Sequence, residues 1–391
     1  MHLATLVHAS LLAVCALPYA AAQATVAIDT AAARGKPEPI AALDALPEGA
    51  LLLRFQGGER GLGGHSGERF EVSGAGDEFL VGGLGSGGEE LLEVELDGGT
   101  TIPLGIEHLR LLRHPVRAQG LPLERPKEGD RLWRSRGSTV ERIDGALLSF
   151  AGDALVFEGD KVGELVVPFA ELVALAVEGL GGGAVKQTGQ ERLVSVDLRD
   201  GSRVRGAFAA LDGRRLSLRR EERALALPIG LVSQALVLDG RARWISSLPP
   251  AEASPARPFG DDQGMSWAPR MDRNSAGGRL ACGGEVHARG VGLLAGARVA
   301  WDLDGRPARL RATCGLDDGV SSLSLAPVAR AVVEVDGKVL WDSGPLAAGA
   351  APVFVDLDLG AARRVALVAL DHDGDFAGDR VAFASALLIQ P

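Results

Sequence analysis

Residues 279–318 decide the fold and read RLACGGEVHARGVGLLAGARVAWDLDGRPARLRATCGLDD. Glycines and aspartates divide this stretch into short apolar runs, and the same pattern continues toward residue 391. The runs 299–303, 332–335 and 353–359 are too short for helices and are separated by turn formers such as Asp304–Gly305 and Asp336–Gly337. Asp-Gly pairs tolerate the positive φ of tight hairpins. Short runs at this spacing predict strands of an antiparallel, jelly-roll-like β-sandwich.

The order of these motifs resembles the glycosyl hydrolase family 98 carbohydrate-binding module, also called the novel carbohydrate-binding module. The motifs in register are G-x-G at 290–292, V-x-W-D-L at 299–303, A-T-C-G-L-D-D at 312–318, V-E-V-D-G-K-V-L-W-D-S-G at 333–344, and the segment 371–386. The resemblance covers residues 241–391 and implies a sandwich that folds alone and binds a glycan without catalysis. Leu294 and Arg380 stand where the family has histidine, and these departures bear on ligand binding, not on the fold.

The first 24 residues have the pattern of a secretory signal peptide. Residues 3–17 form an apolar run too short to span a bilayer, and Ala20–Ala24 offers two A-x-A cleavage sites. We therefore expect a secreted, periplasmic or cell-surface protein. No later segment is long and apolar enough to predict a membrane span.

A weaker repeated pattern, or rhythm, of apolar runs occupies the region before the sandwich. Proline lies inside or beside similar apolar runs at Pro103, Pro168 and Pro228, and each run is soon followed by another. We interpret this rhythm as divergent repeats, each a small, strongly bent β sheet or barrel with its proline at a strand start or edge. The chain is therefore predicted to be all-β, and the expected β-rich units are 45–115, 128–178 and 190–240.

Composition limits the partners. The net charge is −10 without a basic block, which argues against a nucleic-acid partner. Cys282 and Cys314 lie on expected strands of the sandwich. Export would permit a disulfide between them, and two buried thiols are the equally weighted alternative.

The segment Asp371-His372-Asp373-Gly374-Asp375 is the best candidate for a metal site. Three carboxylates, Asp371, Asp373 and Asp375, alternate around a glycine, and such oxygens suit calcium, which accepts six to eight oxygen ligands. The alternative is a solvated turn built from good turn formers. The carboxylates are too close in sequence to flank the bond that a glycosidase cleaves.

Sugar sites usually stack an aromatic plane on the sugar and fix its hydroxyls with polar groups. Aromatic residues are only 4% of the chain. Trp301, Trp341 and Phe383 lie within motif strands and are expected in the core, which leaves Trp267 as the freer aromatic. We expect the ligand-binding residues to be Trp267, His372 and Arg380.

Three functions remain open from the sequence. The first is a non-catalytic protein that binds a glycan or a cell-envelope polysaccharide. The second is an envelope structural or protein-interaction protein whose sandwich has lost sugar binding. The third is a hydrolase with its active site in the repeats, but the sequence of the repeats shows no set of residues suited to acid/base catalysis.

Overall fold

The computed structural model describes residues 24–390 apart from 57–66, 86–87, 98, 125, 127, 179–191, 221–222, 261–264 and 323–325. The expected signal peptide lies outside the described residues, except for residue 24. Within these residues every named element is a strand or a 3-10 turn, so the predicted all-β class is confirmed. None of the described helical segments is long and apolar enough to cross a membrane.

Strands β4 to β18 repeat one order of elements three times: four strands, a 3-10 turn and a fifth strand. The first set contains β4 (Phe70–Gly74), β5 (Phe79–Gly85), β6 (Leu91–Glu95), β7 (Thr101–Gly105), η1 (Ile106–His108) and β8 (Leu109–Arg113). The second set contains β9 (Asp130–Arg136), β10 (Thr139–Ala151), β11 (Ala154–Gly159), β12 (Gly163–Pro168), η2 (Phe169–Glu171) and β13 (Leu172–Ala176). The third set contains β14 (Leu193–Leu198), β15 (Arg203–Leu211), β16 (Arg215–Arg220), β17 (Arg223–Pro228), η3 (Ile229–Leu231) and β18 (Val232–Val237).

Proline and bulges shape these sets. Pro168 and Pro228 are each the last residue of the fourth strand in their set, directly before the 3-10 turn. At a strand end, the missing N–H of proline does not interrupt the hydrogen bonds between strands. The long second strands β10 and β15 each shift register once against the third strand, which bends them strongly. Whether the predicted units 128–178 and 190–240 are separate domains stays a prediction.

The N-terminal strands complete the third set. These strands are β1 (Thr25–Thr30), β2 (Glu38–Pro39) and β3 (Ala50–Gln56). β3 lies inside the predicted unit 45–115, yet it pairs with β1 and β18. Its sequence, ALLLRFQ, is buried at five of seven positions because it lies between two strands with both faces covered.

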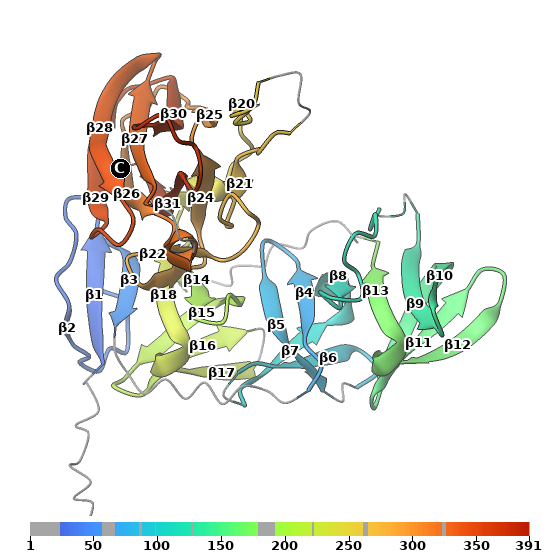
Figure 1. Ribbon diagram of the computed structural model, residues 1–391. Coiled ribbons are helices and arrows are strands. Elements are labelled where there is room, and N and C mark those ends of the chain that lie inside the picture. The colour runs from blue at the N-terminus through green and yellow to red at the C-terminus, as the bar shows by residue number, and fades with distance from the viewer. Residues whose placement is uncertain are drawn as a thin grey trace, which may run out of the picture.

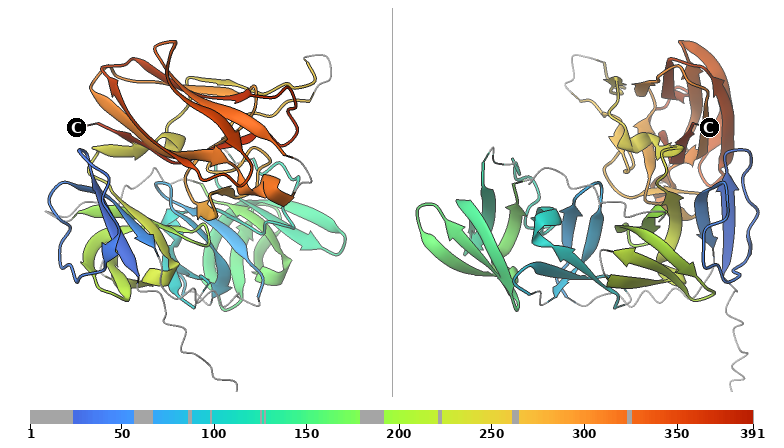
Figure 2. Two further views of the ribbon diagram at one scale, coloured as in Figure 1. Left: turned by 60° about the vertical axis from the view of Figure 1, so that its left-hand side comes forward. Right: turned by 180° about the vertical axis from the view of Figure 1, so that it is seen from behind.

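The three sets stand in a row, with the first set in the middle (Figures 1 and 2). β8 pairs with β13 of the second set, and β5 touches β15 of the third through Arg203 and Phe79. These pairings join β1 to β18 into one 18-stranded sheet around a common hydrophobic core.

Residues after 241 form a sandwich over the end of the row that carries β1–β3 (Figures 1 and 2). One sheet contains β19 (Ala242–Trp244), β21 (Arg270–Met271), β24 (Gly290–Leu294), β26 (Ala308–Leu316), β29 (Val353–Gly360) and β31 (Arg380–Ile389). The other contains β20 (Glu252–Ser254), β25 (Arg298–Asp302), β27 (Val328–Val335), β28 (Lys338–Ala347) and β30 (Arg364–Asp371). The remaining elements are η4 (Ile245–Ser247), the hairpin β22 (Leu280–Cys282) and β23 (Glu285–His287), and η6 (Asp318–Ser322).

The signature motifs have structural causes. A Cβ at Gly290 would lie 2.4 Å from the backbone oxygen of Phe383, and a Cβ at Gly292 would lie 2.3 Å from that of Arg273. The two glycines of the G-x-G block therefore allow β24 to pack closely against its neighbours. Trp301 and Phe383 are buried between the sheets as expected. Trp341 is only partly buried against this core.

The sandwich contacts the row in several places, and two of them bear on the expectation that it folds alone. An apolar seam joins Leu51, Leu52 and Leu236 of the row to Ala242, Trp244, Leu387 and Ile389 of the sandwich. Beside the seam, Arg289 of the sandwich is 1% exposed and pairs with Asp197 and Asp77 of the row. An isolated sandwich would expose the seam and leave Arg289 without two of its carboxylates.

Candidate functional site

Trp267 lies beside a cavity at one end of the sandwich. Its backbone bridges to Ala256, and the two N–H···O bonds of the bridge are both 3.0 Å, so the loop after β20 is held against the core. The indole is partly buried and packs on the core cluster. The cavity has a volume of about 320 Å³. It is lined by Pro258, Phe259, Trp267, Ser275, Ala276, Leu294, Gly374, Asp375, Phe376, Ala377, Gly378 and Arg380.

Aromatic rings form one part of this cavity wall. Phe259 is 59% exposed, and its ring centroid lies 6.3 Å from that of Trp267 at an interplanar angle of 58°. Phe376 comes from the loop between β30 and β31. A partly exposed aromatic pair beside an open cavity offers apolar planes for a ligand.

The polar groups of the cavity are few. Arg380 is the first residue of β31, where its backbone pairs with Leu294. Among the described residues no carboxylate forms an ion pair with the Arg380 guanidinium at short range. Asp375 is the only lining carboxylate among the residues described, and its Oδ1 accepts a hydrogen bond of 3.0 Å from the Ala377 N–H. The cavity therefore combines apolar planes with a guanidinium that is free to donate.

The structure brings together Trp267 and Arg380 but does not place His372 with them. His372 is exposed and is not among the residues that line the cavity. Phe259 and Phe376 were missed by sequence reasoning. The sequence marked Phe259 only as an aromatic residue in the Pro-rich stretch before Trp267.

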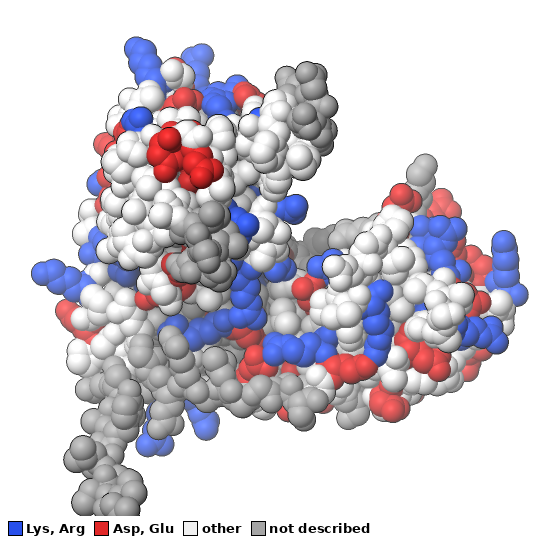
Figure 3. Space-filling view, viewed as in Figure 1, with Lys and Arg blue, Asp and Glu red and all other residues white. Residues whose placement is uncertain are grey.

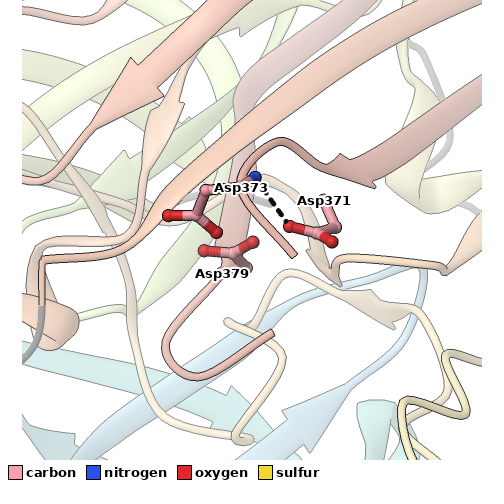
Figure 4. Close-up of side chains that lie close together, drawn as sticks. All are labelled: Asp371, Asp373 and Asp379. Atoms are coloured by element: carbon pink, nitrogen blue, oxygen red, sulfur yellow. Dashed lines mark hydrogen bonds between the residues drawn. The ribbon is translucent and has the colours of Figure 1, made fainter. Parts of the chain in front are cut away.

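The aspartates after β30 divide between two places. One carboxylate oxygen each of Asp371, Asp373 and Asp379 lies within 4.8 Å of the other two, and Figure 4 shows the three carboxylates converging. Asp375 is not in this group and faces the cavity instead. An acidic patch over this loop is visible on the sandwich in Figure 3. Asp379 was not among the metal ligands expected from the sequence, although it begins the family motif in which Arg380 replaces histidine.

Asp379 is fully buried, unlike its two companions. Burial raises the pKa of its carboxyl to about 7, and the charges of Asp373, Asp371 and Asp375 add to the shift. The Val328 amide opposes the shift without making a hydrogen bond of normal geometry. The loop therefore places one buried carboxyl beside two carboxylates that are more accessible to water.

Cys282 and Cys314 are both buried free thiols. Burial raises the pKa of Cys282 to about 12, with smaller contributions from Asp318, Asp317 and Glu285, and it also raises the pKa of Cys314. Thiols held in this protonated state behave as small apolar side chains. This arrangement corresponds to the second of the two alternatives that the sequence left open.

A second cavity, of about 380 Å³, lies where the row meets the sandwich. Its lining includes Arg203 and Asp272, whose side chains pair at 3.2 Å, while Arg203 also pairs with Asp197 at 3.2 Å. His287 borders this cavity, and its Nδ1 lies 3.1 Å from Ser385 Oγ. Because the charges here pair with one another across the junction, we interpret this cavity as part of the contact between row and sandwich.

Comparisons with known proteins give structural likenesses and one family match. Among solved structures, the CBM51 of Clostridium perfringens GH95 in complex with methyl-galactose is 19% identical, with a TM-score of 0.32, over 38% of this chain and 99% of that one. The CBM51-2 and INT domains of Clostridium perfringens ZmpB are 16% identical, with a TM-score of 0.34, over 45% of this chain and 36% of that one.

The tandem CBM51 modules of a family 98 glycoside hydrolase from Streptococcus pneumoniae are 13% identical, with a TM-score of 0.33, over 66% of this chain and 88% of that one. At these TM-scores the likenesses carry no argument about this chain. No curated protein matches it. Residues 241–389 match the family described as NPCBM/NEW2 domain, and this match supports a carbohydrate-binding module in the C-terminal part of the chain.

Proposed function

We propose that this chain is an exported, non-catalytic protein that binds a glycan or cell-envelope polysaccharide at the cavity beside Trp267. The observation that carries the proposal is the composition of this cavity, which lies inside the segment matched as NPCBM/NEW2 domain. The relation to family 98 in particular is part of the proposal, as is a location outside the cytoplasm.

The cavity suits a sugar in size and chemistry. The rings of Phe259 and Trp267 offer planes on which the C–H face of a pyranose can stack. Arg380 has up to five N–H donors for hydroxyl oxygens, and the Asp375 carboxylate accepts from hydroxyl hydrogens. A volume of about 320 Å³ is at the lower end for ligand pockets, so one or two sugar units would fill it.

The same cavity argues for binding without hydrolysis. Glycosidases commonly place two carboxyl groups on either side of the scissile bond. Of the described residues that line this cavity, Asp375 alone carries a carboxylate. A bound sugar would therefore contact the Asp375 carboxylate, but the described lining offers no second carboxyl group on the opposite side of the bond.

A glycan array probed with the full-length protein tests the proposal. Trp267→Ala, Phe259→Ala and Arg380→Gln are each expected to weaken binding, because loss of a central anchor costs on the order of 2 kcal/mol, roughly thirtyfold in affinity. His372→Ala is the matched variant from the same loop region. It is expected to change affinity less, because His372 lies outside the cavity lining. An effect as large as that of Trp267→Ala would extend the site to His372.

The alternative function is an envelope structural or protein-interaction protein. It is favoured by Val339 and Leu340 on the edge strand β28, which are 61% and 47% exposed. Exposed apolar side chains at a sheet edge suit contact with another protein. Absence of binding on a broad array, together with capture of envelope proteins that Val339→Lys abolishes, would favour this alternative.

A further inference from the structure

The loop from β30 to β31 holds three carboxylates in one place by fixing both of its ends. Asp371 ends β30, and Asp379 directly precedes β31. Asp371 Oδ1 accepts the N–H groups of Asp373 at 3.1 Å and Gly374 at 2.9 Å, which folds the turn back on itself. Gly374 and Gly378 have φ values of 88° and 87°, a region in which glycine is favoured. The convergence in Figure 4 is thus built into the backbone.

Asp379 is the independent sign that this place takes a ligand. Its side chain is 0% exposed, it points into the group, and neither of its oxygens has a hydrogen-bond partner among the residues described. Its backbone carbonyl accepts the Ala295 N–H at 2.9 Å, so the residue is held against the sandwich. Buried polar groups in folded proteins nearly always have partners, and a buried carboxylate without one costs free energy. A bound cation would supply that partner.

No protein cation takes this role. In the described part of the chain, no lysine or arginine forms an ion pair with Asp371, Asp373 or Asp379. Three ionised carboxylates within 4.8 Å repel one another, and a cation between them relieves this repulsion. The group therefore lacks a counter-charge of its own.

The ligand set selects the ion. All three donors are carboxylate oxygens, which favours a hard divalent cation over zinc or copper, whose sites use histidine and cysteine. Two oxygens bonded to the same Ca²⁺ at about 2.3–2.6 Å lie up to about 5 Å apart, and the observed separations of at most 4.8 Å are within that limit. Mg²⁺ demands a smaller, nearly ideal octahedron, whereas Ca²⁺ accepts irregular sets completed by carbonyls and water.

We propose that Asp371, Asp373 and Asp379 form a calcium site that fixes the loop on one side of the cavity. The sequence alone pointed to Asp375 as the third ligand, and the structure assigns Asp379 to that position. Gly374, Asp375, Phe376, Ala377 and Gly378 lie between the ligands and line the cavity. Ion binding would hold these residues in place for a sugar. That last consequence rests on the proposed function, whereas the ion site itself does not.

Thermal unfolding of the chelator-treated full-length protein tests the ion site without any glycan. Millimolar CaCl₂ is expected to raise the Tm, because an ion that binds only the folded state stabilises it by mass action. MgCl₂ at the same concentration is expected to raise it less. Titration calorimetry is expected to show one calcium per chain. An unchanged Tm together with no binding heat would overturn the proposal.

Two variants in the same loop locate the ligands. Asp379→Asn keeps the side-chain volume and removes the buried charge, so we expect a higher Tm in chelator than for the natural chain and no calcium response. Asp375→Asn lies outside the group and is expected to keep the calcium response. The reverse pattern, with calcium binding lost in Asp375→Asn and kept in Asp379→Asn, would refute the assignment. If Asp379→Asn does not fold, the exposed ligand Asp373→Asn replaces it, with the same loss expected.

Amide hydrogen exchange separates the ion site from the glycan site. Calcium is expected to slow exchange across residues 373–379 in the natural chain and not in Asp373→Asn. This result would support the calcium site even if the glycan array shows no binding. If calcium binds but exchange in this loop does not change, the claim that the ion fixes the loop is refuted.

Discussion

Arg289 of the sandwich and Asp197 of the row form an ion pair in which both side chains are almost completely buried. Arg289 Nε lies 3.5 Å from Asp197 Oδ1, and the two side chains are 2% and 0% exposed. Gln234 donates to the other oxygen of Asp197 at 2.9 Å. The charges of Asp197, Asp272 and Asp77 raise the pKa of Arg289 despite its burial. The two parts of the molecule thus share one buried electrostatic centre.

Removing this arginine should strongly destabilise the molecule. Arg289→Met keeps much of the side-chain volume but leaves the buried Asp197 with Arg203, 3.2 Å away, as its only cation in the described residues. Breaking a buried pair typically costs about 3–5 kcal/mol, and the remaining Arg203 places the expected loss toward the lower end of that range. Urea denaturation measures the loss. Arg306→Met is the control, because Arg306 pairs with Asp304 on the surface and exposed pairs contribute about 0–1 kcal/mol. Equal stability of Arg289→Met and the natural chain would show that the pair does not hold the parts together.

Trp301 and Trp267 should respond differently to truncation. Trp301 is 1% exposed and its Nε1 donates to the Leu248 carbonyl at 3.1 Å. Trp301→Ala is expected to cost about 3–5 kcal/mol, because it leaves a large cavity between the sheets. Trp267→Ala is expected to cost less, since its indole is only partly buried. Chemical denaturation of both variants checks this, and a larger loss for Trp267→Ala would place Trp267 in the core.

His287 should contribute to acid sensitivity. Burial lowers the pKa of its imidazole, although Glu285 partly opposes the shift. Between that lowered pKa and the ordinary value of about 6.5, the unfolded chain binds a proton that the folded state does not, so stability falls as pH decreases through this window. His287→Gln should flatten the fall in free energy of unfolding as the pH decreases below about 6.5. His372→Gln, at an exposed position, serves as the comparison, and identical pH profiles for all three proteins would contradict the prediction.

The two thiols of the sandwich should be inert in the folded protein. A thiol with a pKa of about 12 is a thiolate, at pH 8, less often than an ordinary cysteine by more than about a thousandfold. In a Cys15→Ser background, iodoacetamide should label Cys282 and Cys314 only after denaturation. Mass spectrometry of native and unfolded samples measures this. Rapid labelling of either thiol in the native protein would show that its burial is incomplete in solution.

Local sequence was enough to predict the strands and several turns. Asp336 and Gly337 have φ values of 49° and 78° and join β27 to β28 with Val335 opposite Lys338, as an Asp-Gly hairpin requires. The expected strands at 299–303 and 353–359 appear within one residue as β25 and β29. These features depend on residues adjacent in the chain, which is why a sequence can disclose them.

Contacts between distant segments were not predictable in the same way. β3 pairs with β18 although about 180 residues separate Leu53 from its partner Ala235, and its apolar sequence alone could not choose between neighbours. Asp379 gained its importance from burial against Ala295, and Phe259 from the bridge between Ala256 and Trp267. Spacing on the same loop suggested Asp375 instead. Each of these outcomes depends on tertiary packing that local propensity does not encode.

The continuous sheet of the row has a mechanical consequence. β8 pairs with β13 over three residue pairs and β5 pairs with β15 through one, so the three sets are joined by backbone pairing as well as by the chain itself. Tension on a ligand held beside Trp267 would pass into the row through the buried charges around Arg289 and through the apolar seam. Force on the sandwich would thus reach the row through non-covalent contacts as well as through the connection between β18 and β19.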